Sequence, residues 1–292
     1  MRISGVLLRV LGFYLLSGVF TQVLMKFLTG YNITNYNTLK LIPNGPQSLL
    51  LAQGGGMFLG FIILPLIYVY FMKPSLKDIF KGMNGKKTAS VFVFSILAIL
   101  FCGPFISALQ GWNQAMPLPS GLEKVLKTME ETAKVVTELL VYQPTWSGFL
   151  LAAIVIGIIP AIAEELVFRG IMQKELKEEN WNPHVIIWVT AIVFSAIHLQ
   201  FYGFFPRLLL GAMMGYMAWW TNSLSAPMIF HCINNLSTLI AFNLYKYKNL
   251  GPDPEQTSFS WYTVLASALI TAALIYFFKT FIRKPEEPPT VY

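Results

Sequence analysis

Charged residues are scarce in this sequence. Asp, Glu, Lys and Arg make up 12% of its 292 residues, whereas soluble domains carry about 25%. Hydrophobic residues make up 55% of the chain, and the mean hydropathy is +0.58. So little charge excludes an ordinary soluble domain and indicates an all-α protein that crosses a membrane several times.

Cysteine is rarer still. The only two cysteines, Cys102 and Cys232, lie in apolar segments. We expect them to be buried apolar side chains, which excludes a disulfide framework and a cysteine-based metal cluster. The net charge of +7 would suit nucleic acid in a soluble chain. Here the cations gather between apolar runs, so they indicate membrane orientation, with lipid rather than nucleic acid as the partner.

Long apolar runs are what the sequence does have. We predict a bundle of about eight transmembrane helices, at residues 7–28, 49–72, 88–109, 146–177, 183–199, 208–220, 228–245 and 261–282. The first lacks a small-residue cleavage site, so we expect an uncleaved span. The glycines at 54–56 predict close helix contact, and Pro104 predicts a kink.

A polar stretch at 111–145 separates the first three spans from the rest. Apolar residues recur there at three- and four-residue spacing over 122–140, which predicts one amphipathic connecting helix on the membrane surface or across the bundle. This helix could be a solvated connector with one packed face, or it could control access to the interior of the bundle. We therefore divide the chain into a three-span region (1–110), this connector (111–145), a core of four spans (146–245), and a last span with a disordered tail (246–292).

An even number of spans places both termini on one side of the membrane. Basic residues predominate on that side, at Arg2, the five lysines of 73–87, Lys174, Lys177, Lys279, Arg283 and Lys284. The opposite side holds Lys40, Lys124, Lys127, Lys134, Lys246 and Lys248. This bias predicts that the termini and the loop 73–87 face the cytoplasm, with the chain in the cell membrane.

Ionisable residues inside the apolar runs mark a candidate site. Glu164 and Glu165 follow 25 residues without a charge, Arg169 lies one helical turn later, and His198 ends the next apolar run. Such a residue costs several kcal/mol within lipid unless it is paired or faces a polar cavity, so it is a functional candidate. His184, by contrast, is expected at an interfacial position.

The spacing of two of these residues suggests that they meet. Asn180, Asn182 and Pro183 predict a turn near Trp181. Glu164 lies 17 residues before Trp181 and His198 lies 17 residues after it. In an antiparallel hairpin both would lie about 25 Å from the turn. We therefore expect the two side chains to approach within about 8 Å, directly or through one water.

Three motifs in successive apolar helices resemble those of a known family. They are Glu164-Glu165-Leu-Val-Phe-Arg169, Phe194-Ser-Ala-Ile-His198 and His231-Cys-Ile-Asn-Asn235. They are similar to the EExxxR, FxxxH and HxxxN motifs of the CAAX protease and bacteriocin-processing family (CPBP, or Abi). That family includes the type II CAAX prenyl endopeptidases. The resemblance covers about residues 146–245.

The resemblance implies an intramembrane endopeptidase. Glu164 with His198 would activate a water for attack on a peptide bond, and His231 and Asn235 would stabilise the oxyanion. Glu165 and Arg169 would form an ion pair that keeps the site in shape. From the residues alone, Phe194 is expected to be a packing residue, and His231 with Asn235 would suit an interhelical hydrogen bond.

Alternatives remain at this stage. Glu164, His198 and His231 could hold Zn²⁺ with a water in the fourth position, although the same residues suffice without a metal, which we favour. A non-catalytic membrane protein that binds or chaperones a partner could use the same cavity. A proton-coupled transporter is less favoured, since no paired broken helices recur in two matching halves.

Overall fold

The computed structural model describes residues 3–32, 36–42, 44–73, 82–251 and 258–282. Every regular element within these ranges is a helix, which confirms the predicted all-α membrane fold. The tip of the basic loop at 74–81, most of the predicted loop at 251–254, and the predicted disordered tail from residue 284 lie outside the described residues.

The described residues of the first half form five α-helices with two short inserts. They are α1 (Ile3–Thr29), the 3-10 turn η1 (Tyr36–Leu41), α2 (Gly45–Met57), the π-helix η2 (Phe58–Ile63), α3 (Leu64–Met72), α4 (Gly85–Gln114) and α5 (Ser120–Val141). Because η2 continues α2 into α3, Gly45–Met72 is one unbroken apolar helix.

The second half is arranged around another unbroken helix, Trp146–Glu178. It consists of α6 (Trp146–Ala152), the π-helix η4 (Ala153–Ile158), α7 (Ile159–Glu165), the π-helix η5 (Leu166–Met172) and α8 (Gln173–Glu178). It is followed by α9 (Pro183–Ala196), the 3-10 turn η6 (Phe201–Gly203), α10 (Phe204–Thr221), α11 (Ser225–Lys248) and α12 (Trp261–Ile282).

These helices coincide with the eight predicted spans. Five are long and apolar enough to cross a membrane: Ile3–Thr29, Gly45–Met72, Gly85–Gln114, Trp146–Glu178 and Trp261–Ile282. Of the other three, α9 is apolar but has only 14 residues, α10 carries Arg207, and α11 carries several asparagines and a histidine. All three belong to the predicted core of four spans (146–245).

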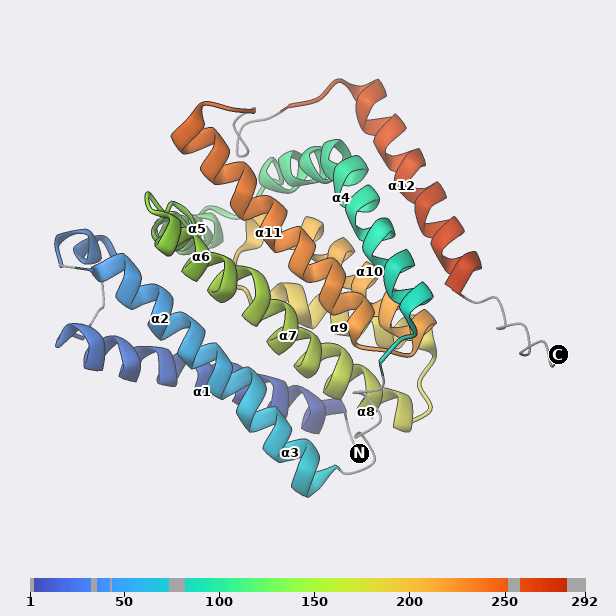
Figure 1. Cartoon of the computed structure of the whole chain (residues 1–292), viewed down its shortest axis with the longest axis horizontal. Coiled ribbons are helices and arrows are strands. Elements are labelled where there is room, and N and C mark those ends of the chain that lie inside the picture. Colours follow the sequence, from blue (N-terminus) through green and yellow to red (C-terminus); the bar gives the residue numbers. More distant parts are fainter. Residues whose placement is uncertain (1–2, 33–35, 43, 74–81, 252–257, 283–292) are drawn as a thin grey trace.

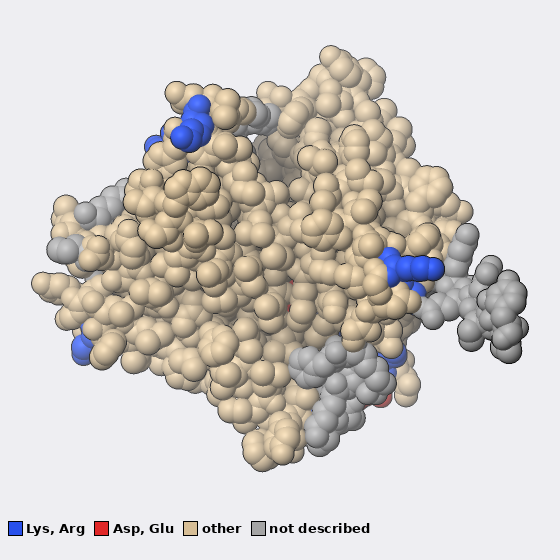
Figure 2. Space-filling model, in the orientation of Figure 1, with Lys and Arg blue, Asp and Glu red and all other residues tan. Residues whose placement is uncertain are grey.

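The Trp146–Glu178 helix runs diagonally through the middle of the molecule (Figure 1). The pair α1 and α2 packs on one side of it, and α11 packs against η4 and α7 on the other. Helices α4 and α12 form the far edge. On the face drawn in Figure 2, Lys and Arg show only near the margins of a broad uncharged surface. Exposed apolar side chains such as Leu8, Phe27 and Leu100 suit contact with lipid.

Glycines bring α2 into direct contact with two neighbours. A Cβ atom on Gly54 would lie 2.9 Å from Cγ2 of Val155 in η4. A Cβ atom on Gly56 would lie 2.0 Å from Oγ1 of Thr21 and 2.8 Å from the Ser17 carbonyl oxygen of α1. The close helix contact predicted from residues 54–56 is confirmed, and it fixes α2 beside the central helix.

Gly56→Leu is therefore expected to destabilise the protein by about 1–3 kcal/mol, because the new side chain must push α1 and α2 apart. Thermal unfolding in detergent measures the loss. Gly12→Leu is the matched control, since nothing lies within 4 Å of a Cβ atom at that position on α1. Equal unfolding temperatures for the two variants would contradict the contact.

Helix α4 bends along its length (Figure 1), and it contains Pro104, the residue at which we predict a kink. Proline has no N–H to donate, so the helical hydrogen-bond ladder is interrupted there. Ser267 of α12 fills the interruption: its Oγ accepts from the N–H of Phe105 at 3.1 Å and donates to the carbonyl of Phe101 at 2.6 Å. The bend is thus stabilised by a side chain inserted from another helix.

The helix of the third predicted span extends beyond the predicted end of that span at residue 109. Helix α4 continues to Gln114, and Asn113 is fully buried in its last turn. Asn113 Oδ1 accepts a hydrogen bond from the N–H of Phe205 at 3.0 Å, in the first turn of α10. The polarity of 111–114 suggested a connector because this partner lies 92 residues away in the sequence.

Helix α5 confirms the predicted amphipathic helix and lies across the bundle. It is seen nearly end-on in Figure 1, where α6, α7 and α8 lie close to the plane of the view. Its first turns are exposed and hold an ion pair between Lys127 and Glu123 at 2.7 Å. Its last turn buries Leu139, Leu140 and Val141.

A cluster of polar side chains joins α1, α3 and α8 at the end of the bundle away from α5. Glu175 of α8 is 1% exposed and accepts hydrogen bonds from Arg9 of α1 and Tyr68 of α3, each at 2.5 Å. Close by, Lys73 and Glu178 form an ion pair at 2.9 Å. The start of α1 and the ends of α3 and α8 therefore lie together at one end of the molecule.

Candidate active site

The central helix carries the candidate residues where its geometry changes. Helix α7 ends at Glu165, with one π-helical segment before it and another after it. Such segments are rare and often occur at functional sites. Glu164, Glu165 and Arg169 are all buried, so these charges face the interior of the bundle rather than lipid.

Glu165 and Arg169 form the predicted ion pair. Arg169 Nη1 donates to Glu165 Oε1 at 2.9 Å, and both side chains are fully buried. Arg169 Nη2 donates to the Gly211 carbonyl of α10 at 2.6 Å, and the guanidinium carbon lies 4.9 Å from the centre of the Phe194 ring. The arginine therefore joins the central helix to α9 and α10.

His231 of α11 lies between the two glutamates. Its Nδ1 is 3.0 Å from Glu165 Oε1, and its Nε2 is 3.9 Å from Glu164 Oε2. A carboxylate only accepts hydrogen bonds, so Nδ1–H donates to Glu165. This contact orients the ring so that Nε2 faces Glu164. Carboxylates orient imidazole rings in the same way in many enzyme active sites. The sequence motifs did not indicate this interhelical contact with Glu165.

His198 is held in a different way. Its Nδ1 is 2.7 Å from the carbonyl oxygen of Phe194. A carbonyl oxygen only accepts, so Nδ1–H is the donor and Nε2 of the neutral ring is left as an acceptor. The Phe194 ring contacts both imidazoles edge-on, with its centroid 5.1 Å from that of His198 and 6.1 Å from that of His231. Phe194 thus packs, as predicted, and also orients His198 through its backbone.

Asn235 contributes an amide to the same region. Its Oδ1 accepts a hydrogen bond from Asn234 Nδ2 at 3.3 Å. That bond orients the Asn235 amide and leaves its Nδ2 group free to donate, since no acceptor for it lies within the described residues. His231 and Asn235 lie one turn apart on α11, but no hydrogen bond joins them there.

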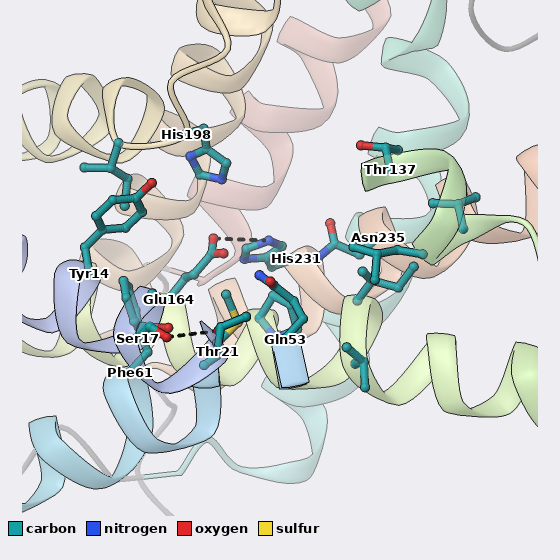
Figure 3. Close-up of a pocket in the computed structure, with 18 of the residues that line it drawn as sticks. Tyr14, Ser17, Thr21, Gln53, Phe61, Thr137, Glu164, His198, His231 and Asn235 are labelled. Atoms are coloured by element: carbon teal, nitrogen blue, oxygen red, sulfur yellow. Dashed lines mark hydrogen bonds and ion pairs between the residues drawn. The ribbon is translucent and has the colours of Figure 1, made fainter. Parts of the chain in front are cut away.

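These side chains line one cavity of about 700 Å³ (Figure 3). Glu164, His198, His231 and Asn235 all border it. Among the described residues no hydrogen bond joins Glu164 to His198, and their approach to within about 8 Å stays a prediction. A second cavity of about 410 Å³ shares His198, His231 and Asn235 with the first, so the two cavities meet at these residues.

Three residues bordering the cavities were missed in the sequence. Tyr14 of α1 and Gln53 of α2 line the larger cavity. Each is an uncharged polar residue in an apolar span, and such residues are too common to single out a site. Arg207 of α10 lines the smaller cavity and interacts electrostatically with Glu164 and with Glu130 of α5. Arg207 could have been found by the rule that selected Glu164, because it is a cation inside an apolar run.

Helix α5 forms part of both cavities. Thr137 borders the larger one and Glu130 borders the smaller one. Burial raises the pKa of Glu130 above its ordinary value, and the nearby Arg207 acts in the opposite direction. The amphipathic helix is therefore part of the site's enclosure rather than a detached connector.

The zinc alternative requires Glu164, His198 and His231 around one ion. In the part of the chain that the structure describes, no group of three His, Cys, Asp or Glu side chains is arranged to hold a metal ion. The side chains as placed do not fit a three-ligand metal site.

Comparisons with known proteins agree with the motifs. The family model described as type II CAAX prenyl endopeptidase Rce1-like matches residues 146–237. An uncharacterized protein of Bacillus subtilis (strain 168), YpbD, is 30% identical over 77 residues, which cover 25% of this chain and 36% of that relative. The chain thus matches about a third of the relative's length. No solved structure matches the chain.

The matched segment holds every site residue predicted from the motifs, whereas Tyr14 and Gln53 precede it. It begins at Trp146, with the central helix, and includes most of the candidate site. Residues 146–237 of this chain therefore resemble the type II CAAX prenyl endopeptidases, which confirms the resemblance predicted from the three motifs.

Proposed function

We propose that this protein is an intramembrane endopeptidase that hydrolyses a peptide bond with an activated water. The observation that carries the proposal is the composition of one cavity between membrane helices. The cavity holds a buried carboxylate (Glu164), an imidazole nitrogen free to accept (His198 Nε2), and two potential donors (His231 and Asn235). Peptide hydrolysis needs a base and oxyanion donors of this kind.

In the proposed reaction Glu164, assisted by His198, accepts a proton from water. The water oxygen then bonds to the peptide carbonyl carbon, and the electron pair of the C=O bond moves onto its oxygen. Asn235 donates a hydrogen bond to this oxyanion from its Nδ2 group. His231 donates through Nε2–H, which requires the cationic imidazolium because Nδ1–H is already bound to Glu165. When the intermediate collapses, the C–N bond breaks and the proton held by Glu164 and His198 passes to the leaving amine.

The buried ion pair has a positioning role in this proposal. Arg169 holds Glu165, and Glu165 holds Nδ1 of His231. Nε2 of His231 is thereby aimed toward the space beside Glu164. Fixed donors of this kind stabilise a developing charge without first having to reorient. No step of the reaction passes through a metal.

The purified full-length chain in lipid vesicles tests the proposal. It is incubated with a random-sequence pool of fluorescence-quenched peptides, and products are identified by mass spectrometry. We expect cleavage that persists after prolonged chelation. Loss of cleavage with chelator and recovery on adding zinc would contradict the metal-free reaction. Peptide binding without cleavage would favour a non-catalytic binding protein or chaperone instead.

We also propose that the chain lies in the cell membrane with the Arg9–Glu175 end on the cytoplasmic side. The bias of Lys and Arg toward that end supports this orientation. Gly82→Cys places a thiol at an exposed position just before α4, where a Cβ atom meets nothing within 4 Å. Lys124→Cys places one at the exposed start of α5.

We expect an impermeant thiol reagent to label Lys124→Cys in intact cells, and Gly82→Cys only after permeabilisation. The two native cysteines are partly buried, and the unmodified chain gives their background labelling. Strong labelling of Gly82→Cys in intact cells would overturn the orientation.

A further inference from the structure

The wall of the larger cavity formed by α1 and α2 carries polar groups that the proposed catalytic reaction does not use. Tyr14 and Gln53 both line this cavity together with Glu164 and His231 (Figure 3). Resting on the proposed function, we infer that Gln53 binds the main chain of an extended peptide substrate beside the catalytic residues, with Tyr14 as a second contact.

Neither side chain has a partner that would explain it. Within the described residues no hydrogen bond is made by the Gln53 amide or the Tyr14 hydroxyl, and both residues are partly buried. A polar group among membrane helices is costly unless something polar satisfies it. These two groups therefore suit a cavity that receives a polar molecule.

The chemistry of Gln53 indicates what that molecule is. A primary amide presents one carbonyl acceptor and an NH₂ donor side by side. An extended peptide presents the complementary pair, an N–H and a C=O, along each edge. Within a membrane-embedded cavity the peptide main chain has little water to bond, so it must find such partners in the protein. Recognition of the main chain is independent of the peptide's side chains.

The structure also fixes where Gln53 stands. Its neighbour Gly54 lies against Val155 of η4, so close that an added Cβ atom would be 2.9 Å from that side chain. Val155 belongs to the same unbroken helix as Glu164. The backbone at Gln53 is thus held against the central helix, which places its amide in the same cavity wall as Glu164.

Binding can be measured separately from cleavage in the Glu164→Gln background, where the proposed hydrolysis is blocked. Two probes are used: a random-sequence decapeptide pool, and a second pool with N-methylated peptide bonds. Each is presented to the chain in lipid vesicles. Adding Gln53→Leu is expected to lower retention of the unmodified pool by about 10- to 30-fold, the loss of two hydrogen bonds. The N-methylated pool should bind more weakly than the unmodified pool to the protein that keeps Gln53. In the protein that carries Gln53→Leu, the two pools should differ in retention by less than about 2-fold.

Gln22→Leu is the matched control. Gln22 borders the same cavity, but its amide already lies 3.4 Å from the Tyr36 hydroxyl, so binding should be unchanged. If Gln53→Leu does not fold, Tyr14→Phe removes a single hydroxyl and should lower retention about 5-fold. A loss for Gln22→Leu as large as for Gln53→Leu would overturn the inference.

The inference and the proposed function can fail separately. Cleavage by the unmodified chain with unchanged retention in Gln53→Leu and in Tyr14→Phe would overturn the inference and leave the endopeptidase intact. Retention that depends on Gln53 and is sensitive to N-methylation, in a chain that cuts no peptide, would support the inference and reject the endopeptidase.

Discussion

Glu164→Gln is expected to lower peptide cleavage by about 10²- to 10⁴-fold while the protein stays folded. Glutamine keeps the size of the side chain, but it cannot accept the proton of the attacking water. Glu164 is almost fully buried and contacts His231 only at 3.9 Å, so the change breaks no hydrogen bond among the described residues. Initial rates of peptide cleavage and thermal unfolding of the same preparation measure the two effects.

Glu123→Gln is the matched control for this variant. It makes the same chemical change on the exposed face of α5, where Glu123 pairs only with Lys127. We expect cleavage within about 2-fold of the unmodified chain, because an exposed ion pair of this kind contributes at most about 1 kcal/mol. An active Glu164→Gln protein would reject Glu164 as the base, whatever the result for Glu123.

Arg169→Ala is expected to destabilise the protein by about 3–5 kcal/mol, the usual cost of removing one member of a buried ion pair. Glu165 would remain fully buried without its cation, and the Gly211 carbonyl would lose its donor at 2.6 Å. His231 would lose the anchor on its partner carboxylate, so cleavage by the folded fraction should fall as well.

Thermal unfolding and the yield of folded protein in detergent test this expectation. Lys127→Ala, which breaks the exposed pair with Glu123, is the control and should change stability by no more than about 1 kcal/mol. If Arg169→Ala were as stable as the unmodified chain yet inactive, Arg169 would act directly in the reaction rather than by positioning Glu165 and His231.

The helices and the core of the candidate site could be predicted because membrane proteins tolerate few ionisable residues within lipid. Glu164, Arg169 and His198 stood out against long apolar runs, and the turn near Trp181 set the central helix against α9. What could not be predicted depends on partners far away in the sequence. Asn113 extends α4 through Phe205, and His231 uses Glu165, 66 residues earlier.

The contribution of the N-terminal helices could not be predicted for a related reason. Gln53 is an ordinary polar residue in the sequence, and only the packing of α2 against η4 through Gly54 places it beside Glu164. The π-helical segments around α7 were also not predicted, because they change which side of the helix a residue faces without any distinctive residue type.

The bend of α4 links an early part of the chain to its last helix during biosynthesis. Ser267, which completes the hydrogen bonding around Pro104, lies 162 residues after Phe105. Translation proceeds from the N-terminus, so α4 leaves the ribosome long before α12. Until α12 arrives, the N–H of Phe105 and the carbonyl of Phe101 lack the hydroxyl that joins them. Because α4 also packs on α10 and α11, the helices that enclose the candidate site reach their final arrangement only after the last span is inserted.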